Sequence, residues 1–180
     1  MVYVFLAQGF EIVEALAPVD IMRRAKLDVK TVGVTGKTVV SSNGIPVTAD
    51  ITTKEMKLDN ELDLIVLPGG MPGANNLEAD RYVQEAIDFC VDKDRYVSAI
   101  CAAPKILGHK GLLKGRKATC FPGFENDLEG AILTDELAVK DGKFITGKGA
   151  GAAFAFGFKL VELLVGADKA AAVSAQMQCR

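Results

Sequence analysis

The chain has 180 residues, of which 49% are hydrophobic and 24% charged, so it is long enough for one domain with its own core. Its net charge of -2 gives no reason to expect specific nucleic-acid binding or an anionic membrane surface as a partner. Four cysteines without metal-type spacing and a single histidine argue against a cysteine–histidine metal site.

The chain opens on an apolar segment typical of a strand, Val2–Ala7, and we therefore expect no signal or transit peptide. No apolar run is long enough for a transmembrane helix, so no membrane partner is expected. Because the cysteines also show no disulfide framework, these features predict a reduced, cytoplasmic protein.

The first helix is predicted over Glu11–Lys26, because apolar residues recur there at helical spacing. Glu14 lies off this apolar stripe, near the start of the helix and beside the sheet edge. Acidic residues in a first turn commonly stabilise the helix dipole and face water, which is the interpretation that the pattern alone favours for Glu11 and Glu14. Pro18 cannot bond the carbonyl of Glu14, so a bend or a restart is expected there.

Strand and hairpin signals follow. Alternating valines predict a second strand over Asp28–Thr35, and Val39–Val40 and Ile45–Val47 flank the turn signal Asn43-Gly44, which predicts a small β-hairpin excursion. Asp63–Leu67 is a fully apolar run of the buried, parallel-sheet type.

A glycine-rich loop, Pro68–Gly73, leads from this strand to a helix that begins at about Ala74. Glycines let backbone amides turn outward toward an anion or an oxyanion, although a tight turn that needs positive φ is an equally ordinary reason for them. Asp80–Lys93 is predicted to be an amphipathic helix, with Cys90 packed on its apolar face.

The most informative stretch is Tyr96–Ile100, a short apolar strand that leads into Cys101, two alanines and a helix opened by Pro104. A strand-to-helix turn exposes its corner residue at the carboxyl edge of a sheet, where α/β proteins bind ligands. Helix-start amides would lower the pKa of Cys101 and favour a reactive thiolate. Alternatively, Cys101 is a small buried residue that ends a core strand, and spacing alone gives both interpretations equal weight.

A further short strand is predicted over Arg116–Cys120, and the turn Asp141-Gly142 joins Leu137–Lys140 to Lys143–Thr146 in a hairpin. The glycines of residues 147–152 match a dinucleotide-binding pattern. They stand at the wrong end of the chain, with no later strand to carry the ribose-binding acid, so no dinucleotide site is predicted.

Phe154–Val165 is apolar nearly all round and is predicted to be a buried helix, and a last short helix is predicted over Ala167–Gln178. Strands precede helices throughout, and nothing repeats. The chain is therefore predicted to form a single α/β domain over residues 1–180: a doubly wound, mostly parallel sheet with helices on both faces and a small β-hairpin excursion.

Five stretches together resemble the DJ-1/PfpI superfamily in order and spacing, over essentially the whole chain: Glu14–Ala25, Asp63–Gly70, Ser98–Pro104, Ala118–Glu125 and Ile145–Glu162. The resemblance is closest to the bacterial DJ-1-like branch often labelled ThiJ or thiazole monophosphate biosynthesis protein, a naming habit that says little about chemistry. It implies a flavodoxin-like version of the predicted fold.

The resemblance also implies roles. Cys101 matches the family's reactive, nucleophilic cysteine and Glu14 the acid that hydrogen-bonds its sulfur, which overrides the structural interpretation of both. Backbone amides of the oxyanion or binding pocket are implied at Gly69, Gly70 and Ala102. A carboxyl group beside a thiolate should have a raised pKa, because two adjacent anions repel. Three further residues are expected near the pocket: Arg24, Cys120 and Phe121.

Two family histidines are replaced in this chain. The protease branch has a histidine directly after the cysteine, where this chain has Ala102, so a cysteine protease is disfavoured. Another branch has one before the proline of the fourth stretch, where this chain has Phe121. His109 lies roughly 12 Å along the predicted helix from Cys101 and is interpreted as a surface or helix-end residue, so Glu14 would have to move protons alone.

Two functions follow from the resemblance. The first is cofactor-independent, cysteine-dependent handling of a small aldehyde substrate: glyoxalase III-type conversion of methylglyoxal to lactate, or deglycase action on early glyoxal adducts. The second is an oxidative-stress sensor or redox-regulated chaperone, in which Cys101 oxidises to a sulfinic acid held by Glu14. No metal or other cofactor is expected, and the resemblance implies a homodimer.

Overall fold

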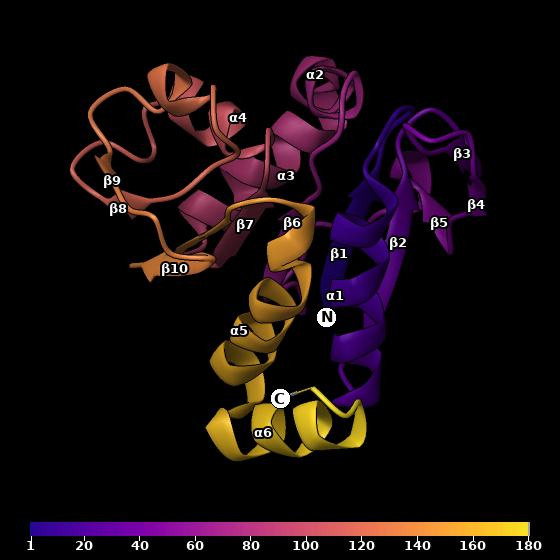
Figure 1. Cartoon of the computed structure of the whole chain (residues 1–180). Helices are drawn as coiled ribbons and strands as arrows, with labels where there is room; N and C mark the ends of the chain where they lie inside the picture. The colour runs from indigo at the N-terminus through magenta and orange to yellow at the C-terminus, as the bar shows by residue number, and fades with distance from the viewer. Residues whose placement is uncertain (180) are drawn as a thin grey trace.

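The computed structural model describes residues 1–179 and places a seven-stranded sheet at the centre (Figure 1). The strand order is β10-β11-β7-β6-β1-β2-β5, and all neighbours are parallel except β10 and β11. The strands are β1 (Val2–Leu6), β2 (Val29–Gly33), β5 (Ile51–Thr52), β6 (Leu64–Leu67), β7 (Tyr96–Ile100), β10 (Ala138–Asp141) and β11 (Phe144–Gly147).

Helices cover both faces of this sheet, as the doubly wound prediction requires. On one face α1 and α5 stand side by side and α6 crosses below them (Figure 1). The helices of this face are α1 (Ile12–Arg24), α5 (Ala153–Val165) and α6 (Ala167–Gln176); those of the other face are α2 (Gly73–Ala79), α3 (Arg81–Asp92) and α4 (Pro104–His109). Within residues 1–179, no helix combines the length and the apolar character that crossing a membrane requires.

The alternation of side chains along each strand divides the core into two layers. In β1, Val2, Val4 and Leu6 pack with the buried residues of α1 and α5, whereas Tyr3 and Phe5 pack with those of α3 and α4. Because both faces are buried, the strand is apolar at every position, as is typical of a parallel sheet.

The smaller elements lie outside the main sheet. The hairpin around Asn43-Gly44 is confirmed as β3 (Thr38–Val40) and β4 (Pro46–Thr48). The strand predicted over Arg116–Cys120 is shorter: β8 (Lys117–Ala118) pairs with β9 (Ile132–Leu133), which the sequence did not indicate because two residues carry no periodicity. Three single 3-10 turns complete the fold: η1 (Thr53–Glu55), η2 (Glu125–Asp127) and η3 (Ala150–Ala152).

Two helix predictions need correction. First, α1 is one continuous helix through Pro18, so of the bend or restart expected there the restart is wrong; α5 packs closely at this point, where a Cβ at Gly157 would lie 3.2 Å from the Cα of Pro18. Second, α5 is not buried all round, because the sheet, α1 and α6 leave one side open. Phe154 and Val165 on that helix are 43% and 44% exposed.

The parallel arrangement brings four distant segments of the chain to one edge of the sheet. The strands β11, β7, β6 and β1 are consecutive neighbours, and their carboxyl ends lead into residues 148–152, 101–104, 68–73 and 7–14. Ligands of open α/β sheets bind at this edge.

Candidate active site

Cys101 lies at the turn between β7 and α4 in a strained backbone conformation. Its φ is 68°, in the left-handed region that non-glycine residues rarely adopt, at a cost on the order of 1–3 kcal/mol. Its amide donates to the carbonyl of Gly147 at 2.9 Å, and its carbonyl accepts the amide of Phe121 at 2.8 Å. The neighbouring segments therefore hold the corner that turns this side chain toward the sheet edge, as the elbow prediction expected.

Glu14 lies in the first turn of α1 and is only 1% exposed. Its Oε2 atom accepts the amide of Gly69 at 2.9 Å, and its carboxyl group is hydrogen-bonded to the side chain of Cys101. Glu11 is the acid that caps the helix, because its carboxylate accepts the amide of Glu14 at 2.7 Å. The interpretation as a helix-capping acid therefore holds for Glu11 and is wrong for Glu14.

Three backbone amides surround this pair, and they donate to different partners. The amides of Gly70 and Ala102 are hydrogen-bonded to the sulfur of Cys101, where they can also donate to an oxygen that develops beside it. The amide of Gly69 is instead committed to Glu14, so the oxyanion role expected of Gly69 does not fit its geometry. A Cβ at residue 69 would lie 2.7 Å from both Cys101 Cβ and Glu14 Oε2, so only glycine fits between them.

Burial and mutual repulsion shift both titrating groups upward. Burial, together with the charge of Glu11, raises the pKa of Glu14 to about 7, against the opposing hydrogen bonds from Cys101 and Gly69. Burial, followed by the charge of Glu14 and its hydrogen bond to the sulfur, raises the pKa of Cys101 to about 12. The lowered thiol pKa expected at the helix start is therefore wrong while Glu14 is ionised, because the helix-start amides are outweighed.

The pair consequently behaves as one unit that shares a proton. When the proton is on Glu14, the repulsion between the two groups disappears and the carboxyl O–H donates to the sulfur, which favours the Cys101 thiolate. When the proton is on the sulfur, the carboxylate of Glu14 is the negative group. A nucleophilic sulfur is thus obtained by moving the proton within the pair rather than by losing it to solvent.

Phe121 and Cys120 adjoin Cys101 through the backbone but face different ways. The side chain of Phe121 is 47% exposed, whereas that of Cys120 is 6% exposed. Cys120 packs in the core layer of α3 and α4, and Cys101 contacts the layer of α1 and α5. Burial, followed by the charges of Glu125 and Asp127, raises the pKa of Cys120 to about 11, so its thiol is not a second nucleophile at neutral pH.

Arg24 and His109 lie away from the pair within the single chain. Arg24 is in the last turn of α1, roughly 15 Å along the helix from Glu14, and forms an ion pair with Asp20 at 2.8 Å. His109 ends α4, as predicted, and its ring nitrogens contact Glu78 at 2.5 Å and Asp127 at 3.3 Å. Within residues 1–179, no group of three or more His, Cys, Asp and Glu side chains is arranged to hold a metal ion.

Two residues of β11 position the site and were not identified from the sequence. Gly147 accepts the amide of Cys101, and the buried hydroxyl of Thr146 accepts the amide of Thr119 at 2.9 Å. The second bond holds the segment that leads to Phe121 beside the elbow. Neither residue carries a local signal, because a threonine and a glycine at a strand end are ordinary.

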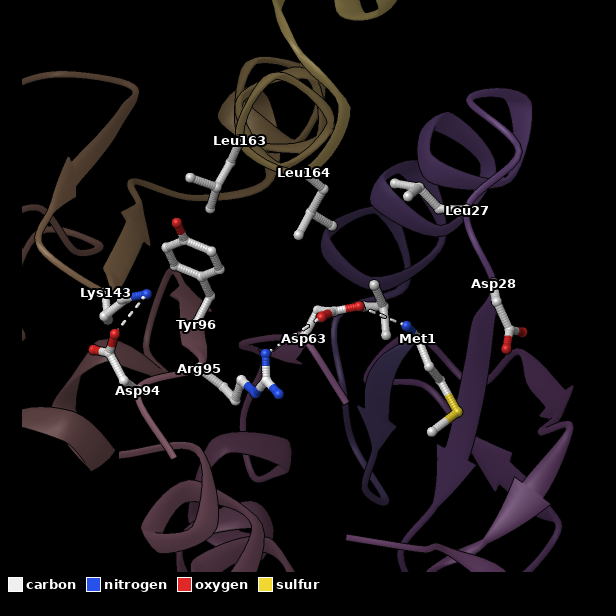
Figure 2. Close-up of a pocket in the computed structure, with 11 residues that line it drawn as sticks. Met1, Leu27, Asp28, Asp63, Asp94, Arg95, Tyr96, Lys143, Leu163 and Leu164 are labelled. Atoms are coloured by element: carbon white, nitrogen blue, oxygen red, sulfur yellow. Dashed lines mark hydrogen bonds and ion pairs between the residues drawn. The ribbon is translucent and has the colours of Figure 1, made fainter. Parts of the chain in front are cut away.

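Two pockets lie at opposite edges of the sheet. An apolar pocket of about 290 Å³ adjoins the elbow and is lined by Phe121, Pro122, Leu137, Lys148, Gly149, Ala150, Gly151 and Ala152. A pocket of about 300 Å³ with several charged side chains lies at the amino ends of β1, β6 and β7 (Figure 2). Since Cys101 follows the carboxyl end of β7, the first of these two pockets lies at its edge of the sheet.

Comparisons with known proteins point to one family. The model of the DJ-1/PfpI family matches residues 1–163. Protein DJ-1 homolog B of Arabidopsis thaliana is 36% identical over 178 residues, 97% of this chain, and the chain spans 40% of that relative's length. The glutathione-independent glyoxalase DJR-1.2 of Caenorhabditis elegans is 30% identical over 161 residues, 88% of this chain and 85% of the relative. A crystal structure of a cysteine-to-alanine mutant of a DJ-1 superfamily protein from Salmonella typhimurium has a TM-score of 0.93 and 34% identity, and the match covers 99% of this chain and 98% of that chain.

Proposed function

The chain belongs to the DJ-1/PfpI family, and we propose that it converts small α-oxoaldehydes to 2-hydroxy acids without a cofactor. The observation that carries this proposal is the buried carboxyl group of Glu14, hydrogen-bonded to the sulfur of Cys101. A nucleophile and a proton carrier with a pKa of about 7 are the two groups that this reaction needs. The similarity to a relative named as a glutathione-independent glyoxalase supports the same reaction class.

The proposed reaction begins when the Cys101 thiolate adds to the aldehyde carbon to give a hemithioacetal. Its oxygen accepts hydrogen bonds from the amides of Gly70 and Ala102. Glu14, which is protonated while the sulfur is a thiolate, gives its proton to this oxygen. Its carboxylate then removes the proton from the former aldehyde carbon and returns it to the neighbouring carbon through an enediol, which leaves a thioester. Water cleaves the thioester and releases the thiol. The sum is addition of one water to the oxoaldehyde, so methylglyoxal gives lactate and no oxidant or reductant is consumed.

The same first step serves a deglycase, in which the sulfur attacks the carbon that joins glyoxal to an amine or thiol. A cysteine protease is a poorer fit, because it needs a histidine base beside the sulfur. The chain has a single histidine, His109, and that ring is bonded to Glu78 and Asp127.

The direct test is lactate formation from methylglyoxal in the absence of glutathione and added metal. We expect Cys101→Ala to lose at least about a thousandfold in kcat, because no other group replaces the covalent step. Cys179→Ala, a thiol removed near the end of the chain, is the matched control and should retain wild-type turnover. Wild-type protein with a confirmed reduced Cys101 and no lactate formation would contradict the proposal.

The pH dependence of kcat/KM should follow the shared proton. Below about pH 7 both Glu14 and Cys101 hold a proton, so the thiolate is absent; above it the pair has lost one proton and the thiolate form becomes accessible. We therefore expect kcat/KM for methylglyoxal to rise with pH through about 7 and to reach a plateau. A profile that is flat between pH 5 and pH 9, or that falls above pH 7, would exclude this assignment.

A second candidate function is an oxidation sensor, favoured by the same three donors around the sulfur. Amides of Gly70 and Ala102 and the protonated carboxyl of Glu14 can hydrogen-bond the oxygens of a Cys101 sulfinic acid. The substitution Glu14→Gln separates the two functions. Glutamine still donates a hydrogen bond, so peroxide should still produce part of the sulfinic acid by intact mass, whereas aldehyde turnover should be lost.

We also propose that the chain works as a homodimer. The open side of α5 and the neighbouring α1 expose the apolar side chains of Phe154 and Val13, at 43% and 42%. Exposed apolar side chains on two adjacent helices are commonly buried against the same face of a second copy in a symmetric dimer. Light scattering should give twice the chain mass of 19.1 kDa, and a monomer mass at micromolar concentration would contradict this proposal.

A further inference from the structure

The apolar pocket beside Cys101 is joined to the elbow by the backbone. Phe121, which forms one wall, donates its amide to the carbonyl of Cys101 at 2.8 Å. The opposite wall begins at Lys148, directly after Gly147, which accepts the amide of Cys101 at 2.9 Å. Both walls are therefore attached, by main-chain hydrogen bonds, to the residue that carries the proposed nucleophile, and the pocket lies at the same edge of the sheet as that residue.

The walls of the pocket are mainly apolar, and their one charged side chain is neutralised by an ion pair. Phe121 and Leu137 contribute large apolar side chains that are 47% and 54% exposed. Lys148 contributes the only charged side chain of the lining, and its ammonium group is paired with the carboxylate of Asp135. The ring of Phe121 also lies against Gly149, where a Cβ would approach it to 3.2 Å, so an aromatic surface closes that side.

We infer that this pocket binds the apolar substituent of the substrate, so that the site favours α-oxoaldehydes with an aryl or branched alkyl group over methylglyoxal. This inference rests on the proposed function for the reaction at Cys101 and adds the substrate class. A methyl group leaves the walls of Phe121 and Leu137 in water, whereas a phenyl group covers them, and removal of apolar surface from water is the driving force.

The first experiment compares phenylglyoxal with methylglyoxal. The wild type should show a kcat/KM at least about tenfold higher for phenylglyoxal, relative to the ratio of the two aldehydes in reaction with free cysteine. Leu137→Asn should lower this selectivity about tenfold. Ile132→Asn is the matched control, because both side chains are 54% exposed and Ile132 does not line the pocket.

A second readout does not require turnover. The alkylation rate of Cys101 is measured by intact mass with iodoacetamide and with N-phenyl iodoacetamide, and Cys101→Ala identifies the signal of that residue. Relative to free cysteine, the phenyl reagent should react at least about tenfold faster with the wild type, and Leu137→Asn should remove most of the preference.

The outcomes separate the inference from the proposed function. Turnover of both aldehydes without selectivity would overturn the inference and leave the function standing. Absence of turnover, combined with selective alkylation, would support the pocket and contradict the function. Equal relative alkylation by the two reagents would overturn the inference even in an inactive protein. The inference would also be overturned if Leu137→Asn changed the molecular mass in light scattering but kept the preference for the phenyl reagent, because the pocket would then be a contact between copies of the chain.

Discussion

Replacing Glu14 with glutamine is expected to reduce aldehyde turnover by about 10²- to 10⁴-fold, the usual contribution of a positioned acid or base. The reason is that glutamine keeps the hydrogen bonds of the carboxyl group and loses its proton chemistry. Its carbonyl oxygen can accept the amide of Gly69, and its NH2 group can donate to the sulfur of Cys101. The measurement is kcat for methylglyoxal, with lactate as the product followed.

The same substitution should make the fold more stable at alkaline pH. In the unfolded chain Glu14 ionises near the ordinary glutamate pKa of 4.5, and in the folded chain near 7, so the stability that protonated Glu14 contributes is complete below pH 4.5 and is lost as pH rises through 7. This difference between the folded and unfolded pKa values lowers the free energy of unfolding by about 3 kcal/mol at pH 8. Urea unfolding should therefore show that the free energy of unfolding of the wild type falls between pH 5 and pH 8, and that this fall is absent in Glu14→Gln.

Glu162→Gln provides the control for this pair of results, because it makes the same change at an exposed position of α5. It should leave turnover and the pH dependence of stability at wild-type values. If Glu14→Gln lost stability at pH 8, or if it retained turnover, Glu14 would not be the proton carrier described above.

Gly69→Ala should damage the site and the fold together. The added methyl group would lie 2.7 Å from Cys101 Cβ and from Glu14 Oε2, and 2.9 Å from the carbonyl oxygen of Ile100. Cys101 Cβ and the Ile100 carbonyl cannot move without the backbone, and Glu14 Oε2 can move only by giving up its hydrogen bonds, so we expect a loss of about 1–3 kcal/mol in the free energy of unfolding. Since relief of the clash separates Glu14 from Cys101, turnover should fall at least about a hundredfold.

Gly151→Ala is the matched control, because a Cβ at that position meets no atom within 4 Å. It should leave the free energy of unfolding within about 0.5 kcal/mol of wild type. Wild-type turnover in Gly69→Ala would show that the close packing around residue 69 is not required for the reaction.

Elements with strong local signals were predictable from the sequence. The apolar run Tyr96–Ile100 followed by small residues and Pro104 predicted β7, the elbow and α4 with their observed order. The hairpins around Asn43-Gly44 and Asp141-Gly142 were also predictable, because those residue pairs favour tight turns whatever surrounds them. Each of these predictions depends on neighbours in the sequence alone.

Features that depend on distant segments were not predictable in the same way. The burial of Glu14 results from the Gly69 loop, more than fifty residues later in the chain, and no pattern within the helix reveals it. The high pKa of Cys101 also depends on distant segments, since burial and, after it, the charge of Glu14 outweigh the nearby amides. From the sequence, only the resemblance to a known family predicted that Glu14 and Cys101 are in contact.

The position of β11 in the sheet has a consequence for the nascent chain. A chain that has been synthesised past Cys101 but not yet to Gly147 has β7 as an edge strand, paired with β6 alone, and the amide of Cys101 then lacks the carbonyl of Gly147 as its acceptor. In that interval β6, on the other side of β7, is the only strand paired with the one that leads into the elbow. Completion of β11, the last strand of the main sheet in chain order, thus fastens the strained corner at Cys101.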